Sequence, residues 1–141
     1  MKFLVINGVN LNMTGVREKG VYGTQTLAQI NAEIGAYFAA KGDEVEFFQS
    51  NIEGEICSKL HSCAEGQYDG IALNAGAYTH YSYAIADAIR SIATPVVEVH
   101  MSNVHAREEF RSRSVLSAAC KGVIAGFGKN SYILALESFR L

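Results

Sequence analysis

The stretch Val96-Val-Glu-Val-His-Met-Ser-Asn-Val-His-Ala-Arg-Glu-Glu-Phe-Arg111 joins a short apolar run to a dense group of polar and charged side chains. Side chains alternate between the two faces of a strand, so Glu98 and His100 should share one face while Val97 and Val99 occupy the other. A carboxylate in that position can orient the imidazole. The stretch therefore predicts a buried strand that ends at an active site.

Two arginines follow this run. If the chain turns helical from Ala106, Arg107 and Arg111 share one helix face, which suits an anionic ligand or a developing negative charge. A structural alternative stays open. The strand carboxylate can simply pair with a buried partner, and Glu109 with Arg113 can form an ordinary surface ion pair at helical spacing.

Length and composition predict one globular domain over residues 1–141. Apolar residues make up 49% of the chain, charged residues 18%, and the net charge is -2, which argues against a nucleic-acid surface. The first apolar run is too short for a signal segment, and none reaches membrane-spanning length. We therefore expect a cytoplasmic protein without a membrane partner. Cys57, Cys63 and Cys120 fit no metal or redox spacing, so we expect small core residues and no metal.

Apolar runs alternate with helical patterns along the whole chain. This alternation predicts an α/β fold with a doubly wound parallel sheet. The expected strands are 3–6, 45–48, 71–73, 95–99 and 123–125. Four helices are expected. The first lies around 27–37, is capped by Thr24 or Thr26 and is ended by Gly42, and the second is marked by Ile56 and Leu60 and ends near Gly66. The third runs from Ile85 to Ile92 and stops before Pro95, and the last covers 133–139.

Polar residues follow four of these strands, where doubly wound sheets bind their ligands. They are Asn7-Gly-Val-Asn10, Gln49-Ser-Asn51, Asn74-Ala-Gly76 and His100-Met-Ser-Asn103. Any one asparagine here can be a simple turn residue, but four polar strand ends that converge favour a ligand site. The first loop has neither a G-x-G-x-x-G motif nor a P-loop, so the ligand should be small and polar, without a pyrophosphate.

The connection 11–23 is long and carries three glycines, which suits a mobile lid. Its chemical groups are Arg17 and Tyr22. A neighbouring guanidinium favours the phenolate, so Tyr22 can serve as a base; alternatively, its ring only pins the loop. His80 begins the third helix, where it can bind a hydroxyl. His61 is a surface or structural residue, whereas His105 can either join the site or cap a short helix.

Several long motifs match one known family. They are Ile6-Asn-Gly-Val-Asn-Leu-Asn12, Arg17-Glu18, Tyr22-Gly23, Gln49-Ser-Asn-Ile-Glu-Gly-Glu55, Leu73-Asn-Ala-Gly-Ala-Tyr-Thr-His80 and the run from Glu98 to Arg111. Over nearly its whole length the chain resembles the type II 3-dehydroquinate dehydratases. The resemblance implies a flavodoxin-like five-stranded parallel sheet in the order 2-1-3-4-5. It also implies anti elimination of water from 3-dehydroquinate through an enolate, without a metal or cofactor.

The resemblance implies a role for each matching residue. Tyr22 would remove the C2 proton, with Arg17 and Arg107 lowering its pKa, and Asn10 would hold a water that stabilises the enolate. His100, oriented by Glu98, would protonate the departing hydroxyl. The substrate would be held by Asn74, His80, Met101 through its backbone amide, Ser102 and Arg111. Asp87 would reach a neighbouring subunit, since the family forms trimers that combine into a dodecamer.

The chain departs from the family pattern at six positions, none of which carries an assigned chemical group: Val9, Lys19, Ile52, Tyr81, Ala86 and Arg113. Lys19 stands where proline is usual, which should loosen the lid, and Tyr81 should alter the pocket rim or the trimer contact. Two alternatives are a flavodoxin-like binding module and a family member that binds without turnover. The resemblance fits both aromatic biosynthesis and quinate breakdown.

Overall fold

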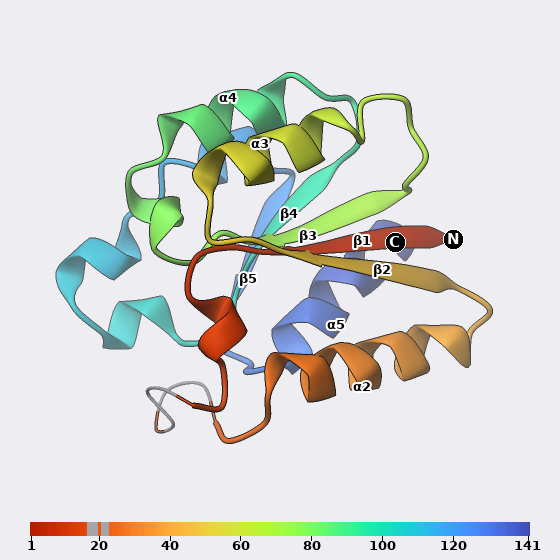
Figure 1. Ribbon diagram of the computed structural model, residues 1–141, viewed down its shortest axis with the longest axis horizontal. Helices are drawn as coiled ribbons and strands as arrows, with labels where there is room; N and C mark the ends of the chain where they lie inside the picture. Colours follow the sequence, from red (N-terminus) through yellow and green to blue (C-terminus); the bar gives the residue numbers. More distant parts are fainter. Residues whose placement is uncertain (17–19, 21–22) are drawn as a thin grey trace.

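The computed structural model describes residues 1–16, 20 and 23–141, and its centre is a parallel sheet (Figure 1). The sheet has five strands in the order β2-β1-β3-β4-β5, which confirms the predicted order and the α/β class. The strands are β1 (Lys2–Asn7), β2 (Glu44–Gln49), β3 (Gly70–Asn74), β4 (Val96–His100) and β5 (Gly122–Ala125).

Helices cover both faces of the sheet, so the fold is doubly wound as predicted. Figure 1 places α3 (Glu53–His61) and α4 (Tyr83–Arg90) over one face, and α2 (Leu27–Ala39) and α5 (Asn130–Glu137) over the other. Short 3-10 helices fill the connections. They are η1 (Leu11–Met13), η2 (Gly76–His80), η3 (Val104–Ala106), η4 (Glu109–Ser112), η5 (Ser117–Ala119) and η6 (Ser138–Arg140).

Local sequence signals explain the bounds of α2. The Thr26 hydroxyl accepts the Gln29 backbone N–H, and the Gln29 side chain accepts the Thr26 N–H, so two of the free donors at the helix start are satisfied. This capping box selects Thr26 over Thr24 as the cap. After the helix, Gly42 has a φ of 82°, a left-handed conformation that glycine adopts without a steric penalty.

The strand alternation divides the core into two layers. In β1, Leu4 and Ile6 pack in the layer under α3 and α4, whereas Phe3 and Val5 pack in the layer over α2 and α5. The three central strands are buried on both faces, which explains why β1 and β3 are apolar between their end residues; β4 is the exception, with Glu98 and His100 on one face. Polar side chains therefore concentrate at the carboxyl ends of these strands.

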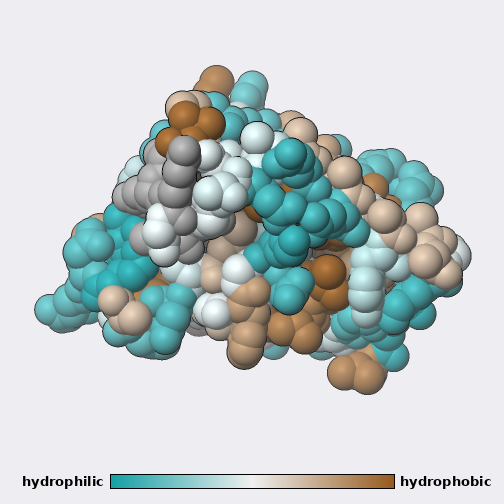
Figure 2. All heavy atoms as spheres, turned by 90° about the horizontal axis from the view of Figure 1, so that it is seen from below, coloured by the Kyte–Doolittle hydropathy of each residue, from teal (hydrophilic) through white to brown (hydrophobic). Residues whose placement is uncertain are grey.

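The outer surface near α2 is mixed in character. Figure 2 shows hydrophilic residues over much of this face, with smaller hydrophobic areas between them. Such a surface is expected where a helix turns its apolar stripe inward, as α2 does with Ile30, Ile34 and Phe38. In the part of the chain that the structure describes, no helix has both the length and the apolarity that a membrane span requires.

Gly8 sets how closely the loops after β1 and β3 approach one another. Its N–H donates to the Asn74 carbonyl at 2.7 Å, and a Cβ at this position would lie 2.4 Å from the carbonyl oxygen of Ala75. Because the clash is with backbone, Gly8→Ala should lower the free energy of unfolding by about 2 kcal/mol or more. Denaturant unfolding measures this loss.

Gly54 provides the matched control. It lies in the first turn of α3, and a Cβ there would meet nothing within 4 Å. Gly54→Ala should raise the free energy of unfolding by about 0.5–1 kcal/mol, because alanine loses less backbone entropy in a helix. Equal stabilities for the two variants would contradict the close approach at Gly8.

Candidate active site

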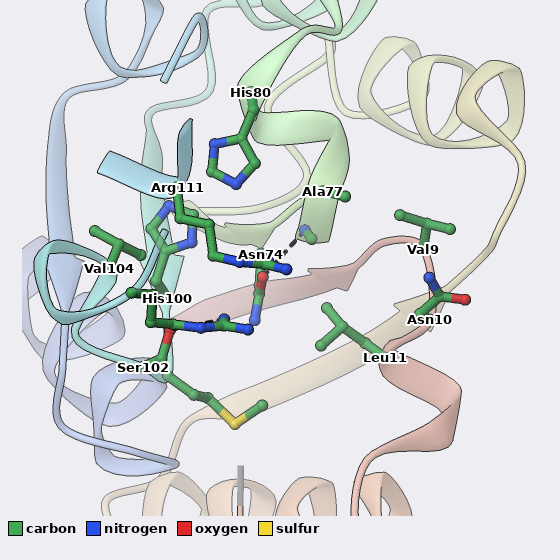
Figure 3. Close-up of a pocket in the computed structure, with 13 residues that line it drawn as sticks. Val9, Asn10, Leu11, Asn74, Ala77, His80, His100, Ser102, Val104 and Arg111 are labelled. Atoms are coloured by element: carbon green, nitrogen blue, oxygen red, sulfur yellow. Dashed lines mark hydrogen bonds between the residues drawn. The ribbon is translucent and has the colours of Figure 1, made fainter. Parts of the chain in front are cut away.

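A cavity opens at the carboxyl ends of β1, β3 and β4 and encloses about 590 Å³, counting the space at its open mouth. Its polar and charged lining suits a small polar ligand. Figure 3 shows side chains that follow β4 facing those that follow β1 across this space. The lining residues are Val9, Asn10, Leu11, Asn74, Gly76, Ala77, His80, His100, Met101, Ser102, Val104, Arg107 and Arg111.

The carboxyl end of β2 has a different role from the one predicted. Among the described residues, none from the stretch Gln49–Asn51 lines the cavity, so three strand ends converge there and not four. Instead, Asn51 Oδ1 accepts the Asn10 backbone N–H at 2.9 Å, and Gln49 Nε2 donates to the Gly8 carbonyl at 3.2 Å. Since β2 is the edge strand beside β1, its polar end supports the β1 loop from behind.

A buried carboxylate–imidazole pair lies at the end of β4. Glu98 and His100 share a strand face, as their spacing predicts, and the Glu98 Oε2 to His100 Nε2 distance is 2.6 Å. Their exposed fractions are 1% and 8%. The pair sits where the strand meets the cavity, so Glu98 is covered by protein while the imidazole reaches the ligand space.

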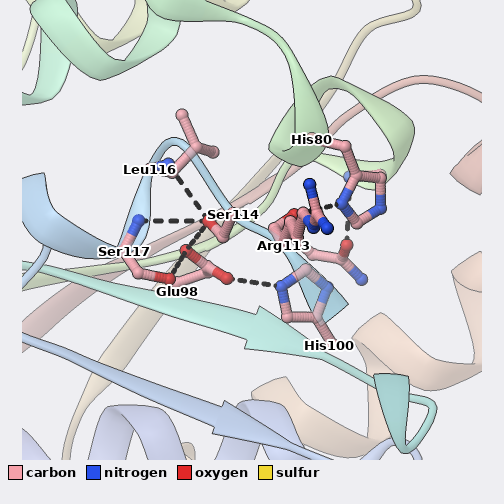
Figure 4. A network of polar contacts seen from close by, with 9 residues as sticks. His80, Glu98, His100, Arg113, Ser114, Leu116 and Ser117 are labelled. Carbon is pink, nitrogen blue, oxygen red and sulfur yellow. Dashed lines mark hydrogen bonds and ion pairs between the residues drawn. The ribbon is translucent and has the colours of Figure 1, made fainter. Parts of the chain in front are cut away.

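The surroundings of Glu98 favour its ionised form. Burial acts to raise its pKa, but hydrogen bonds with His100, Ser114 and Ser117 act in the opposite direction and prevail, so the pKa lies below its usual value. Figure 4 shows these contacts: the Ser114 and Ser117 hydroxyls donate to Oε1 at 2.7 and 2.8 Å. The carboxylate is thus held on both oxygens.

His80 enters the cavity from η2. Its Nδ1 lies 2.6 Å from the Arg113 carbonyl oxygen, which can only accept, so Nδ1 carries a proton. Its ring also packs edge-on against Phe110, with 5.5 Å between the ring centres. These contacts fix the ring in the cavity that Asn74 also lines. The prediction that His80 begins the third helix is wrong, because His80 ends η2 and α4 starts at Tyr83.

Asn74 is held from both sides of its amide. Its Nδ2 donates to the Tyr132 hydroxyl at 2.8 Å, and its Oδ1 accepts the Gly76 N–H at 3.2 Å. The Tyr132 hydroxyl in turn donates to Asn7 Oδ1 at 2.5 Å. All three side chains are buried, so α5 fixes the polar ends of β1 and β3 at the cavity floor.

The two arginines reach the cavity by a different backbone path from the predicted one. The prediction of a helix from Ala106 is wrong: η3 ends there, Arg107 is extended with a φ of −117°, and a separate η4 begins at Glu109. Arg107 and Arg111 therefore share no helix face, yet both line the cavity. Extended backbone at Arg107 separates the two turns, so the chain folds around the opening.

Hydrogen bonds place both guanidinium groups. Arg107 Nη1 lies 3.4 Å from the Ser102 hydroxyl oxygen. Arg111 Nε donates to Glu108 Oε1 at 3.2 Å, and its guanidinium lies 4.8 Å from the centre of the Phe110 ring. The Arg111 hydrogen bond lowers the pKa of Glu108. Both positive charges are thereby directed toward a space that suits an anionic ligand.

Backbone geometry explains why asparagine stands at position 10. Asn10 has a φ of 67°, a left-handed conformation that asparagine tolerates better than most residues. This turn starts η1 and places Asn10 at the cavity edge, across from Ser102 (Figure 3).

Other predicted residues lie elsewhere. Arg17, Lys19 and Tyr22, and with them the core of the predicted lid, lie outside the described residues. Asp87 is on the exposed side of α4, where its carboxylate is 3.6 Å from Arg90. Asn103, not His105, caps η3, since its Oδ1 accepts the His105 backbone N–H.

The cysteines lie outside the cavity lining and are free thiols. Cys120 lies near Glu98, and burial together with that carboxylate raises its pKa to about 12. A thiol of that kind stays protonated and unreactive at neutral pH. Within residues 1–16, 20 and 23–141, no three histidine, cysteine or acidic side chains gather closely enough to hold a metal ion.

Sequence reasoning missed three supporting residues: Ser114, Ser117 and Tyr132. Ser114 and Ser117 have a recognisable sequence signal. They are serines three residues apart just after the arginine stretch, and such serines commonly form hydrogen bonds with nearby backbone groups. Tyr132 gives a weaker signal. It lies within the apolar pattern of α5, where a tyrosine reads as a core residue unless its hydroxyl is known to have a partner.

Comparisons with known proteins agree with one another over nearly the whole chain. The family model described as dehydroquinase class II matches residues 1–140. The 3-dehydroquinate dehydratase of Clostridium beijerinckii is 54% identical over 100% of this chain and 97% of its own length. The enzyme of the same name from Caldicellulosiruptor bescii is 53% identical, covering 99% and 96%. The crystal structure of type II dehydroquinase from Butyrivibrio crossotus has a TM-score of 0.97, 47% identity, and coverage of 100% and 98%.

The acid sensitivity of folding tests the charge state of Glu98. Because its pKa in the folded protein lies below the unfolded value of about 4.3, Glu98 stabilises the fold above that pH. This contribution disappears as the pH falls through the folded-state pKa. Glu98→Gln should therefore weaken the pH dependence of the free energy of unfolding between about pH 5 and pH 2, measured in urea.

Glu65→Gln is the control, because it removes one negative charge from an exposed loop. The Glu98→Gln variant should show a flatter pH profile than both the wild type and this control. Identical profiles for all three proteins would contradict an ionised Glu98 in the folded state.

Proposed function

We propose that this chain, which belongs to the dehydroquinase class II family, eliminates water from 3-dehydroquinate to give 3-dehydroshikimate as a hydro-lyase. One observation carries the proposal beyond family membership: a buried carboxylate orients an imidazole at the wall of a polar cavity that two arginines also line. Elimination of a hydroxyl next to a ketone needs such an acid, together with groups that hold an anionic substrate.

His100 would supply the acid. Glu98 accepts the hydrogen from its Nε2, which leaves Nδ1 as the nitrogen that can serve the ligand. A protonated imidazole there would give its proton to the departing C1 hydroxyl, so that water leaves instead of hydroxide. The ionised carboxylate behind the ring would stabilise the imidazolium before the proton is transferred.

The other described cavity residues would hold the substrate. Arg111 would bind its carboxylate, as the match of a guanidinium fork to a carboxylate favours. His80 and Asn74, both fixed by protein contacts, would bind hydroxyls. Ser102 and the backbone amide of Met101 complete the set at the end of β4.

The base would come from the connection after η1. Tyr22 would remove the C2 proton, with Arg17 and Arg107 stabilising its phenolate, and Asn10 would hold a water at the enolate oxygen. Arg107 and Asn10 support this arrangement, because both line the cavity. The reaction would proceed by anti elimination, with base and acid on opposite faces of the ring.

A direct assay separates this proposal from its rivals. Incubation with 3-dehydroquinate should produce the ultraviolet absorbance of the conjugated enone. A family member that binds without turnover would show ligand binding by calorimetry but no absorbance. A flavodoxin-like module for another ligand would show neither. The location we propose is the cytoplasm, with a role in aromatic biosynthesis or in quinate breakdown.

Tyr22→Phe tests the base. The variant loses only the phenolic oxygen, so kcat should fall by about 100-fold or more while substrate binding persists. Stopped assays and calorimetry measure the two quantities. Tyr37→Phe is the control: it makes the same change on the exposed side of α2 and should leave kcat unaltered. Retention of more than about a tenth of the wild-type kcat in Tyr22→Phe would remove Tyr22 from the role.

We also propose that the chain assembles into trimers that combine into a dodecamer, with Asp87 reaching the site of a neighbouring subunit. Two exposed aromatic side chains support an interface around α4. Tyr81 and Tyr83 remain 58% and 71% exposed in the single chain, and Asp87 lies on the same helix as Tyr83. Across an interface, an Asp87–Arg111 ion pair would be shielded from water and stronger than at a free surface.

Asp87→Ala should therefore reduce both association and activity. Sedimentation at assay concentration should show smaller species than the wild type, and kcat/KM should fall in parallel. Glu65→Ala removes an exposed carboxylate from a loop outside α4 and should change neither quantity. A wild-type monomer with full activity would refute the shared site and the assembly together.

A further inference from the structure

We infer that Ser114, assisted by Ser117, is a positioning residue that holds Glu98 and so decides which nitrogen of His100 faces the cavity. Neither serine lines the cavity, so each would act through the carboxylate. For catalysis the inference rests on the proposed dehydratase function. The imidazole tautomer that it assigns can be measured without any turnover.

The hydrogen-bond direction at Ser114 is fixed by its neighbours. Its hydroxyl oxygen accepts two backbone N–H groups, from Leu116 at 3.0 Å and from Ser117 at 3.1 Å. A hydroxyl has two lone pairs and one hydrogen. Both lone pairs are therefore occupied, and the hydrogen is left for Glu98 Oε1 at 2.7 Å. Ser114 thus acts as a donor toward the carboxylate.

The direction of the Ser114 hydrogen bond determines the protonation of Glu98, and Glu98 in turn determines the tautomer of His100. Oε1 receives the hydroxyl hydrogens of Ser114 and Ser117, so a proton on that oxygen would take the place of one donor and cost a hydrogen bond. The carboxylate stays ionised, and Oε2 accepts the hydrogen from His100 Nε2. A neutral His100 is thereby held as the Nε2–H tautomer, with Nδ1 directed toward the cavity.

The same segment also holds the second histidine of the site. Within residues 113–117, the Arg113 carbonyl accepts the His80 Nδ1 hydrogen, and the Val115 N–H donates to the Thr79 carbonyl at 2.9 Å. Leu116 is fully buried in the core layer under α3 and α4. Figure 4 shows His80 beside Arg113 of this segment, and Glu98 between its two serines and His100. It therefore fixes both imidazoles relative to one another.

A structural role alone would not predict the following results. In the wild type, ¹⁵N chemical shifts of His100, recorded without ligand at a pH where the ring is neutral, should report the Nε2–H tautomer. Ser114→Ala should add the Nδ1–H tautomer, because Glu98 then loses the donor that fixes it. Ser114→Thr keeps the hydroxyl and should restore the wild-type spectrum.

Kinetics provide the second readout. Ser114→Ala should lower kcat by about tenfold or more, the usual effect of losing a hydrogen bond to a charged group, with little change in KM. In deuterated water, exchange at C2 should persist while dehydration slows, because the acid is displaced and the base is not. Ser117→Ala should show the same pattern more weakly, since Ser114 remains.

Ser138→Ala is the matched control. Its hydroxyl is half-buried and donates to the Ala135 carbonyl, so the substitution removes a similar bond at a residue that does not line the cavity. If Ser114→Ala fails to fold, Ser117→Ala carries both measurements. Unchanged His100 tautomers and an unchanged ratio of exchange to dehydration in the serine variants would overturn the inference. Absence of turnover in the wild type would instead refute the proposed function, and the tautomer measurement would still decide the role of Ser114.

Discussion

The hydrogen bond between Glu98 and His100 is the interaction on which the rest of the site depends. A buried carboxylate is costly unless it is paired and hydrogen-bonded, and here both oxygens have donors. Those donors are an imidazole at the cavity wall and two serines from residues 114–117. The energetic requirement of the buried charge therefore determines how the acid is oriented and which connecting segment must pack beside β4.

The sheet provides the geometry that makes this pairing possible. Alternation along β4 directs Val97 and Val99 into the layer with α2 and α5, and so leaves Glu98 and His100 on the other face. Parallel strands also bring the ends of β1, β3 and β4 to one edge, where backbone contacts such as Gly8 to Asn74 hold the loops close together. The same apolar packing that stabilises the fold thus brings the polar groups together at this edge of the sheet.

Most of the architecture could be predicted from the sequence, because buried parallel strands and capped helices leave strong local signals. The strand order and the Glu98–His100 contact followed from a resemblance and from simple alternation. The backbone path of the arginine stretch could not be predicted, since the four-residue spacing of Arg107 and Arg111 fits one α-helix and two separate 3-10 turns equally well. The support from Ser114 and Tyr132 also escaped prediction. Hydroxyl partners far away in the sequence depend on tertiary packing.

The most direct test of the account is the fate of the two proton transfers in His100→Ala. Removal of the acid should block loss of the hydroxyl while the base continues to remove the C2 proton. NMR in deuterated water should therefore show exchange at C2 of 3-dehydroquinate continuing after dehydration has nearly stopped. A parallel fall in exchange and dehydration would contradict the central claim, because His100 would then hold the substrate or the base and not supply the proton.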